Sequence, residues 1–320
     1  MNTGPLVWEN HTCMPLRAAH DFMPQLERYR QNGVDVVSLN VTFDLMDFES
    51  SIRVISFMRH WIGQSADYGV GASIKQIEAN RRQGKTSVVF DIEGLKGIGQ
   101  QLELVETYHA LGVRWASPIY NRTNQFGGGC MDSDNLGLSA LGHDLVKRMN
   151  QVGMVVCCSH TSHQASLDII EASSQPVIFS HSNADAVYAH PRNITDLQMK
   201  ACADRGGVVG INGIGIFLGK NDTSIETFTR HICHVAELVG VEHVGVSLDY
   251  AFDLKEIEEF FEGNRDMFPI NDYGSTLEMV VPEMFGLLPD ALAARGMNQR
   301  EIQLVLGGNW ERIARTVWRL

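Results

Sequence analysis

The 320-residue sequence has no long apolar run and no dense stripe of basic residues. No segment approaches the roughly 20 apolar residues that a helix needs to cross a bilayer, and the N-terminus lacks the basic and apolar blocks of a signal peptide. A formal net charge of −12 would repel a phosphate backbone, and no cluster of lysine, arginine and aromatic residues offsets that repulsion. We therefore predict a cytoplasmic protein that has neither a membrane nor nucleic acid as a partner.

Cysteine is scarce and shows no paired spacing. The six cysteines are Cys13, Cys130, Cys157, Cys158, Cys202 and Cys233, and none of them belongs to a Cys-x-x-Cys motif. A chain of this length can bury a large core without disulfide bonds, so reduced thiols are expected. Cys157 and Cys158 are adjacent in the sequence, and on a strand their side chains would point to opposite faces, which excludes joint metal binding.

The composition is that of a globular protein with one large core. Hydrophobic residues make up 44% of the chain and charged residues 20%. Eight short apolar runs are nearly continuous rather than alternating, which is typical of strands buried on both faces of a parallel sheet. These runs are Leu6–Trp8, Val34–Leu39, Ser87–Phe90, Trp115–Ile119, Met154–Cys158, Val177–Phe179, Val208–Ile211 and Val244–Ser247.

Segments with helical periodicity separate these runs. They include Leu102 to Leu111, Leu141 to Val152, Ala165 to Ala172 and Phe228 to Val239. The alternation predicts an α/β fold, a (β/α)8 TIM barrel that forms a single domain over residues 1–320. A doubly wound open sheet is the main alternative, but no strand is followed by a Gly-x-Gly-x-x-Gly or Walker-type loop. Residues 253–282, rich in acidic and aromatic side chains, are predicted to form an insertion after the eighth strand.

Polar side chains follow each apolar run. In chain order they are Glu9 and His11, Asn40, Asp91 and Glu93, Tyr120 and Asn121, His160, His181, Asn212, and Asp249. The C-terminal ends of barrel strands meet at one face, where barrel enzymes have their active sites. Imidazole and carboxylate groups together suit zinc or a similar divalent ion, so we predict a metal site at this face.

The ligand types also suggest a reaction. Glu93 can bridge two ions because a carboxylate has two oxygens. Two ions can lower the pKa of a water molecule and polarise a carbonyl group, which is the chemistry of amide hydrolysis. A lone histidine after a strand is more often structural, but three histidines at the ends of separate strands favour metal binding. His163, close to His160, is instead assigned to the surface or to the start of a helix.

Several specific segments occur along the chain. The most specific are QPVIFSHS at 175–182 and Pro-Arg-Asn at 191–193, supported by DIEG at 91–94, LGVR at 111–114, NRTN at 121–124, LSALG at 138–142, Met149-Asn150, Ser159-His160 and GGNW at 307–310. Together these segments resemble the membrane (renal) dipeptidase family, peptidase family M19. The resemblance runs from residue 8 to the C-terminus.

The resemblance implies a binuclear zinc site on an amidohydrolase-like barrel. By position, it assigns His11, Glu93, His160 and His181 as metal ligands. Arg192 would contact the carboxylate of a dipeptide or related small substrate, because a planar guanidinium binds carboxylates in a bidentate manner. Asp249 would orient or deprotonate the attacking water. The resemblance also suggests a homodimer.

Two positions depart from the family pattern. The family has His-x-Asp on the first strand, whereas this chain has His11-Thr12-Cys13. Either Cys13 is a thiolate ligand of a second ion, or it binds nothing and leaves that site weak or empty. Tyr120 replaces a histidine that contacts the substrate in the family; its hydroxyl can still donate to an oxyanion, but with a different reach and pKa.

Three functions are therefore considered. The first is a zinc-dependent hydrolase with one or two ions per chain that cleaves a dipeptide or another small amide through a metal-activated water, with Asp249 and Tyr120 as catalytic residues. The second is a non-catalytic relative that binds a small carboxylate, or a mononuclear amidohydrolase with a non-peptide substrate. The third is another metal-dependent barrel enzyme, such as an aldolase or isomerase.

Overall fold

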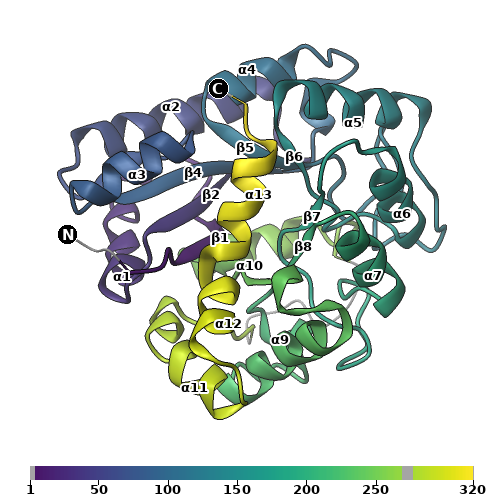
Figure 1. Cartoon of the computed structure of the whole chain (residues 1–320). Helices are drawn as coiled ribbons and strands as arrows, with labels where there is room; N and C mark the ends of the chain where they lie inside the picture. Colours follow the sequence, from purple (N-terminus) through teal and green to yellow (C-terminus); the bar gives the residue numbers. More distant parts are fainter. Residues whose placement is uncertain (1–3, 269–276, 320) are drawn as a thin grey trace.

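The computed structural model describes residues 4–268 and 277–319. Within these residues, parallel strands form a ring surrounded by helices (Figure 1). The ring contains β1 (Trp8–Cys13), β2 (Val36–Phe43), β4 (Thr86–Glu93), β5 (Val113–Ser117), β6 (Val155–Val156), β7 (Ile178–Phe179), β8 (Val208–Ile211) and β9 (Val244–Val246). Each predicted apolar run overlaps one of these strands, so the predicted α/β barrel class is confirmed.

Helices alternate with these strands along the chain. They are α1 (Glu27–Gln31), α2 (Phe48–Gln64), α3 (Ile74–Arg82), α4 (Leu104–Ala110), α5 (Ala140–Val152), α6 (His163–Ala172), α7 (Asp196–Asp204), α8 (Gly215–Leu218), α9 (Ile225–Val239), α10 (Leu254–Gly263), α11 (Leu288–Ala294), α12 (Gln299–Gln303) and α13 (Asn309–Val317). Side-chain caps mark where several begin: Ser139 accepts from the Gly142 N–H at the start of α5, and Ser162 does the same for Ala165 at the start of α6.

The strands pair in parallel, in the order β1-β2-β4-β5-β6 and β7-β8-β9. Between β6 and β7 the pairing narrows to a single bridge, Cys157 to Ile178. Between β9 and β1, a side chain replaces part of the backbone ladder. The buried Glu9 carboxylate accepts from the Leu248 N–H at 2.8 and 3.1 Å, and the Asp249 N–H donates to the His11 carbonyl at 3.0 Å. The short strand β10 (Tyr250–Ala251) then pairs with β1.

The predicted strands are wrong in two respects: polar residues expected after strands lie inside them, and one short strand was missed. The first strand spans Trp8–Cys13 rather than Leu6–Trp8, so Glu9 and His11 lie within the strand and not after it. Asn40, Asp91 and Glu93 likewise lie inside their strands. The apolar runs end before the strands do, because the end of each strand at the open face of the barrel carries polar side chains. The three-residue β3 (Tyr68–Val70), which pairs with the start of β4, was missed because it has glycine at its centre and is too short for a pattern.

Apolar packing closes the end of the barrel opposite the polar residues. Helix α13 crosses this end (Figure 1), and Trp310 packs with Trp8, Trp115 and other residues from inside the ring. The Trp310 indole N–H donates to the Val246 carbonyl at 3.1 Å. A Cβ atom at Gly245 would lie 2.6 Å from the Trp310 ring, so glycine is required for this close approach. The barrel is therefore open at one end only.

The region predicted as an insertion, 253–282, contains α10 and extends to the start of the short 3-10 helix Pro282–Gly286. Residues 269–276 of it lie outside the described residues, so its definition as an insertion in a single domain stays a prediction. Among the residues that the structure describes, no helix has the length and apolar character needed to cross a membrane.

Replacing the indole that seals the closed end should destabilise the whole barrel. We expect Trp310→Ala to lower the free energy of unfolding by about 3–5 kcal/mol, because it leaves a cavity and an unpaired Val246 carbonyl. Urea unfolding followed by circular dichroism measures this. Leu287→Ala, at a side chain that is 59% exposed, is the control and should change stability by less than about 0.5 kcal/mol. Equal stabilities for the two variants would contradict this role of Trp310.

Candidate metal centre

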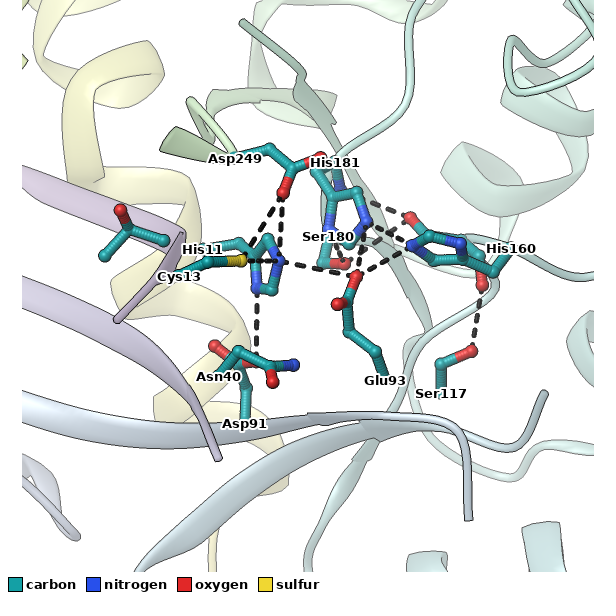
Figure 2. Close-up of polar contacts among 12 residues, drawn as sticks. His11, Cys13, Asn40, Asp91, Glu93, Ser117, His160, Ser180, His181 and Asp249 are labelled. Carbon is teal, nitrogen blue, oxygen red and sulfur yellow. Dashed lines mark hydrogen bonds and ion pairs between the residues drawn. The ribbon is translucent and has the colours of Figure 1, made fainter. Parts of the chain in front are cut away.

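The structure brings the predicted ligands together at the open end of the barrel. His11 and Cys13 come from β1, Glu93 ends β4, and His160, His181 and Asp249 follow β6, β7 and β9. Figure 2 shows Glu93 in the middle, with His11 and Cys13 on one side and His160 on the other. Three sets of ligand atoms lie close enough to hold an ion: His11, Cys13 and Glu93; His11, His181 and Asp249; and Glu93, His160 and His181.

Glu93, His160 and His181 form the tightest of these sets. Glu93 Oε1 lies 2.7 Å from His160 Nε2 and 3.1 Å from His181 Nε2, and the two Nε2 atoms are 2.8 Å apart. All three side chains are buried. Electron-rich atoms from three separate strand ends therefore converge on one small volume.

Hydrogen bonds on the far side of each ring decide what this volume can hold. His160 Nδ1 lies 2.7 Å from Asn121 Oδ1, and His181 Nδ1 lies 2.9 Å from Ser180 Oγ. Asn121 Oδ1 can only accept, which assigns the proton of His160 to Nδ1 and leaves a lone pair on Nε2. Lone pairs facing a carboxylate oxygen at 2.7 Å repel one another unless a cation lies between them. The donor set thus fits a divalent metal ion.

The pKa values of these histidines favour the same state. Burial, followed by the charge of Arg192, lowers the pKa of His160 to about 3. Burial and the nearby His11 also lower the pKa of His181. Burial opposes ionisation of Glu93, but His11 and His160 hold its pKa well below the usual value. At neutral pH this set therefore presents two neutral imidazoles and one carboxylate, which is the protonation state that a metal ion requires.

A second set lies around His11 and Cys13. His11 Nε2 is 3.4 Å from Glu93 Oε1 and 3.3 Å from Asp249 Oδ1, and Cys13 Sγ is 3.6 Å from His11 Nε2. Burial raises the pKa of the Cys13 thiol to about 12. The surrounding carboxylates of Asp91 and Glu93 outweigh burial and raise the pKa of His11. Without an ion this set therefore carries protons that metal binding would displace.

Three residues at the site adopt backbone conformations that non-glycine residues rarely occupy. Asn121, His160 and Asp249 have φ values of 57°, 70° and 55°. Such conformations each cost of order 1–3 kcal/mol and persist where the surroundings hold them. Here they aim side chains from three different loops into the same volume. Three of the five non-glycine residues with positive φ in the described chain therefore lie at this site, and Lys220 and Asn221 are the other two.

Arg192 and Tyr120 border the metal centre. The buried Arg192 guanidinium donates to His160 Nε2 at 3.2 Å, and the Tyr120 ring stacks on the His160 ring with centroids 4.3 Å apart. Both residues, together with Cys13, Glu93 and Asp249, line one cavity of about 320 Å³. Every residue proposed from the sequence is therefore at this end of the barrel. His163 begins α6, as expected from the sequence.

Several supporting residues were noticed in the sequence without being given a role. Asn121 orients His160, Asp91 lies 3.1 Å from His11 Nδ1, and the Asn212 side chain donates to Asp249 Oδ2 at 2.7 Å. Burial raises the pKa of Asp91 to about 7, and His11 opposes that shift. Their common signal is a polar residue at a strand end, but the sequence does not show which ligand each one contacts.

Sequence comparison matches this chain to one family model and to relatives from other organisms. The sequence model of membrane dipeptidase, peptidase family M19, matches residues 18–267. An uncharacterized protein in the pqqA 5′ region of Klebsiella pneumoniae is 32% identical over 260 residues, which cover 77% of this chain and 88% of that protein. An uncharacterized dipeptidase of Schizosaccharomyces pombe, C965.12, is 35% identical over 184 residues, which cover 54% of this chain and only 44% of that protein.

A solved structure shares nearly the whole fold. The crystal structure of an amidohydrolase from Pseudomonas aeruginosa superposes with a TM-score of 0.88 at 27% sequence identity, covering 98% of this chain and 97% of that one. The same chain therefore matches the dipeptidase family by sequence and a metallohydrolase barrel by structure. The alternative of an aldolase or isomerase is left without support.

The geometry predicts which histidines matter for metal binding. We expect His160→Ala to weaken the tightest binding event, because it removes one donor from the set of Glu93, His160 and His181. Isothermal titration of chelator-treated protein with zinc measures this, and the affinity should fall at least 10-fold. His163→Ala, three positions further along the chain at the start of α6 and outside the ligand sets, is the control and should bind as the native protein does. Equal losses in the two variants would show that His160 is not a ligand.

Proposed function

The chain belongs to the membrane dipeptidase family, peptidase family M19, and we propose that this dipeptidase-like metallohydrolase uses zinc to cleave a dipeptide or related small amide next to a carboxylate. The observation that carries the proposal is the position of Glu93, whose carboxylate is shared by a set containing His160 and His181 and a set containing His11 and Cys13. Its two oxygens can serve two ions.

One or two divalent ions would supply a lowered water pKa and polarisation of the substrate carbonyl. Glu93, His160 and His181 would hold the more secure ion, and His11 with Cys13 the second. The imidazole and carboxylate donors suit zinc, which prefers nitrogen, sulfur and carboxylate ligands in low coordination numbers. Buried donors with hydrogen-bonded outer nitrogens need little reorganisation on binding.

Arg192 is proposed to bind the substrate carboxylate. Its guanidinium is buried at the edge of the cavity, where a planar group with several N–H donors can form a bidentate pair with a carboxylate. Its hydrogen bond to His160 places it beside the metal centre. The amide bond next to the bound carboxylate would therefore lie over the ligands, in position for attack.

Asp249 is proposed to manage the proton of the attacking water. Although burial opposes ionisation, His181 and His11 lower its pKa, so it is a carboxylate at neutral pH. Asn212 holds Oδ2, which leaves Oδ1 directed towards His11 and Cys13. The Tyr120 hydroxyl is proposed to donate to the oxyanion that forms at the carbonyl.

A second candidate function is that of a small-carboxylate binder without turnover, or of a mononuclear amidohydrolase. The observation in its favour is Cys13, which stands where the family has a carboxylate ligand. The retained Asp249 argues against a binder, because binding alone has little use for a carboxylate that handles protons. A cytoplasmic location and a homodimer stay predictions from the sequence.

The first experiment tests turnover. Zinc-loaded protein is incubated with a panel of dipeptides and N-acyl amino acids containing L or D residues, and amine release is measured. We expect at least one amide to be cleaved, and we expect Glu93→Gln to lower kcat/KM by at least 100-fold, because it removes the shared charge. Turnover that is unchanged in Glu93→Gln would overturn the proposed site. Ligand binding with no product from any panel member would favour the binder.

The second experiment tests Cys13. Metal content per chain is measured by elemental mass spectrometry for the native protein and for Cys13→Asp. If Cys13 is a working ligand, both proteins hold two ions. If Cys13 binds nothing, the native protein holds one ion and Cys13→Asp holds two, because aspartate restores the missing oxygen donor. One ion in both proteins would contradict the assignment of a second site to His11 and residue 13.

A further inference from the structure

The cavity above the metal centre is polar at its floor and apolar along its walls. Its polar lining comes from Glu93, His160, Arg192, Asp249 and their neighbours. Its apolar lining comes from Met14, Leu16, Phe43, Met46, Ile214, Phe217, Ile257, Phe260, Phe261, Phe268 and Met279. A volume of about 320 Å³ is far more than a substrate with only glycine or alanine side chains would fill.

The part of the apolar lining formed by Phe43 and Met46, here called the wall, lies across the barrel mouth from Arg192, whereas Phe217 lies on the Arg192 side, with its ring centroid 5.4 Å from the guanidinium carbon. Phe43 ends β2 and Met46 follows it, and β2 is the second strand of the ring. Arg192 follows β7, which is the sixth strand. In a ring of eight strands, the second and sixth positions face each other. A substrate held by its carboxylate at Arg192 would therefore extend its other end towards Phe43 and Met46.

Helix α10 completes this wall from above. The Phe260 ring packs edge-on against Phe43 at 4.9 Å and against Phe268 at 5.5 Å, and Phe268 contacts Tyr120 at 6.2 Å. These ring contacts thus connect α10 to Phe43 at the end of β2 and to Tyr120, which stacks on His160. The other face of α10 carries exposed charges such as Lys255 and Glu259. The helix is amphipathic, and its apolar face is the one turned to the cavity.

The acidic side chains at the rim of this wall are already engaged. Arg17 lies 2.7 Å from Asp253 Oδ2 and 3.7 Å from Glu256 Oε1. Both acids line the cavity, and the single positive charge of Arg17 offsets one of their two negative charges.

We propose that the substrate carries a bulky apolar or aromatic group on the acyl side of the cleaved amide, and that Phe260, Phe43 and Met46 select it. This inference rests on the proposed function and adds the chemical class of the acyl group. Burial of such a group against the wall removes its surface from water in the transition state as well as in the bound substrate, which raises kcat/KM.

The test compares acyl groups with the leaving amino acid held constant. Gly-Ala and Phe-Ala form one pair, acetyl-alanine and phenylacetyl-alanine another, each with L- and D-alanine. We expect kcat/KM to be about 10- to 150-fold higher for the aromatic member of a pair, the range that burial of one such side chain supports. A preference for glycyl or acetyl substrates would overturn the inference while leaving the proposed function intact. No cleavage of any amide would count against the proposed function itself.

Variants of the wall then test which residues select the acyl group. Phe260→Ala should reduce the aromatic-to-small ratio of kcat/KM by roughly 5- to 20-fold, and Phe260→Leu should restore most of it. Leu254→Ala is the matched control, because Leu254 is on the same helix, is 48% exposed and does not line the cavity; its ratio should equal that of the native protein. An unchanged ratio in Phe260→Ala would overturn the assignment of the wall.

A misfolded Phe260→Ala would lose both substrates together and would be visible by circular dichroism. In that case Met46→Ala tests the part of the same wall that follows β2. Its ratio should also fall, and a native ratio in that variant would overturn the inference.

Discussion

One carboxylate oxygen organises this end of the molecule. Glu93 Oε1 lies 2.7 Å from His160 Nε2, 3.1 Å from His181 Nε2 and 3.4 Å from His11 Nε2. A buried charge is costly unless it is paired, and buried lone pairs that face it are costly unless a cation separates them. The surrounding structure is built so that these groups stay in place despite that cost. Metal binding would turn the cost into stabilisation.

The supporting interactions follow from this constraint. Three of the converging side chains are held from behind: His160 by Asn121, His181 by Ser180, and Asp249 by Asn212. Left-handed backbone at Asn121, His160 and Asp249 directs side chains from separate loops inward, at a local cost that the rest of the barrel must offset. The tightly packed closed end, where α13 covers the ring, supplies apolar stabilisation far from the polar mouth. Stability and chemistry thus reside at opposite ends of the same strands.

The cavity at the mouth is likewise divided into a polar part and an apolar part. Its floor carries the polar side chains of Glu93, His160, Arg192 and Asp249, whereas Phe43 at the end of β2 and Phe260 of α10 belong to its apolar lining. Loops after barrel strands can change without disturbing the ring, because they make few contacts with the strands' buried faces. Cys13 and Tyr120, which are predicted from the sequence to depart from the family pattern, also line this cavity.

The sequence by itself determined the barrel and predicted which side chains meet at its mouth. Buried parallel strands leave continuous apolar runs, so all eight strands of the ring could be located, and imidazole and carboxylate side chains at strand ends marked the mouth. The apolar runs did not give the full extent of β1, where the polar Glu9 and His11 lie inside the strand. They also missed β3, which is too short to leave a pattern. Only the tertiary structure decided which polar residue supports which ligand, that Glu9 completes the ladder between β9 and β1, and that α10 faces the cavity. The physical reason is that these contacts join residues as many as 239 positions apart, and side-chain type alone does not specify a partner at that separation.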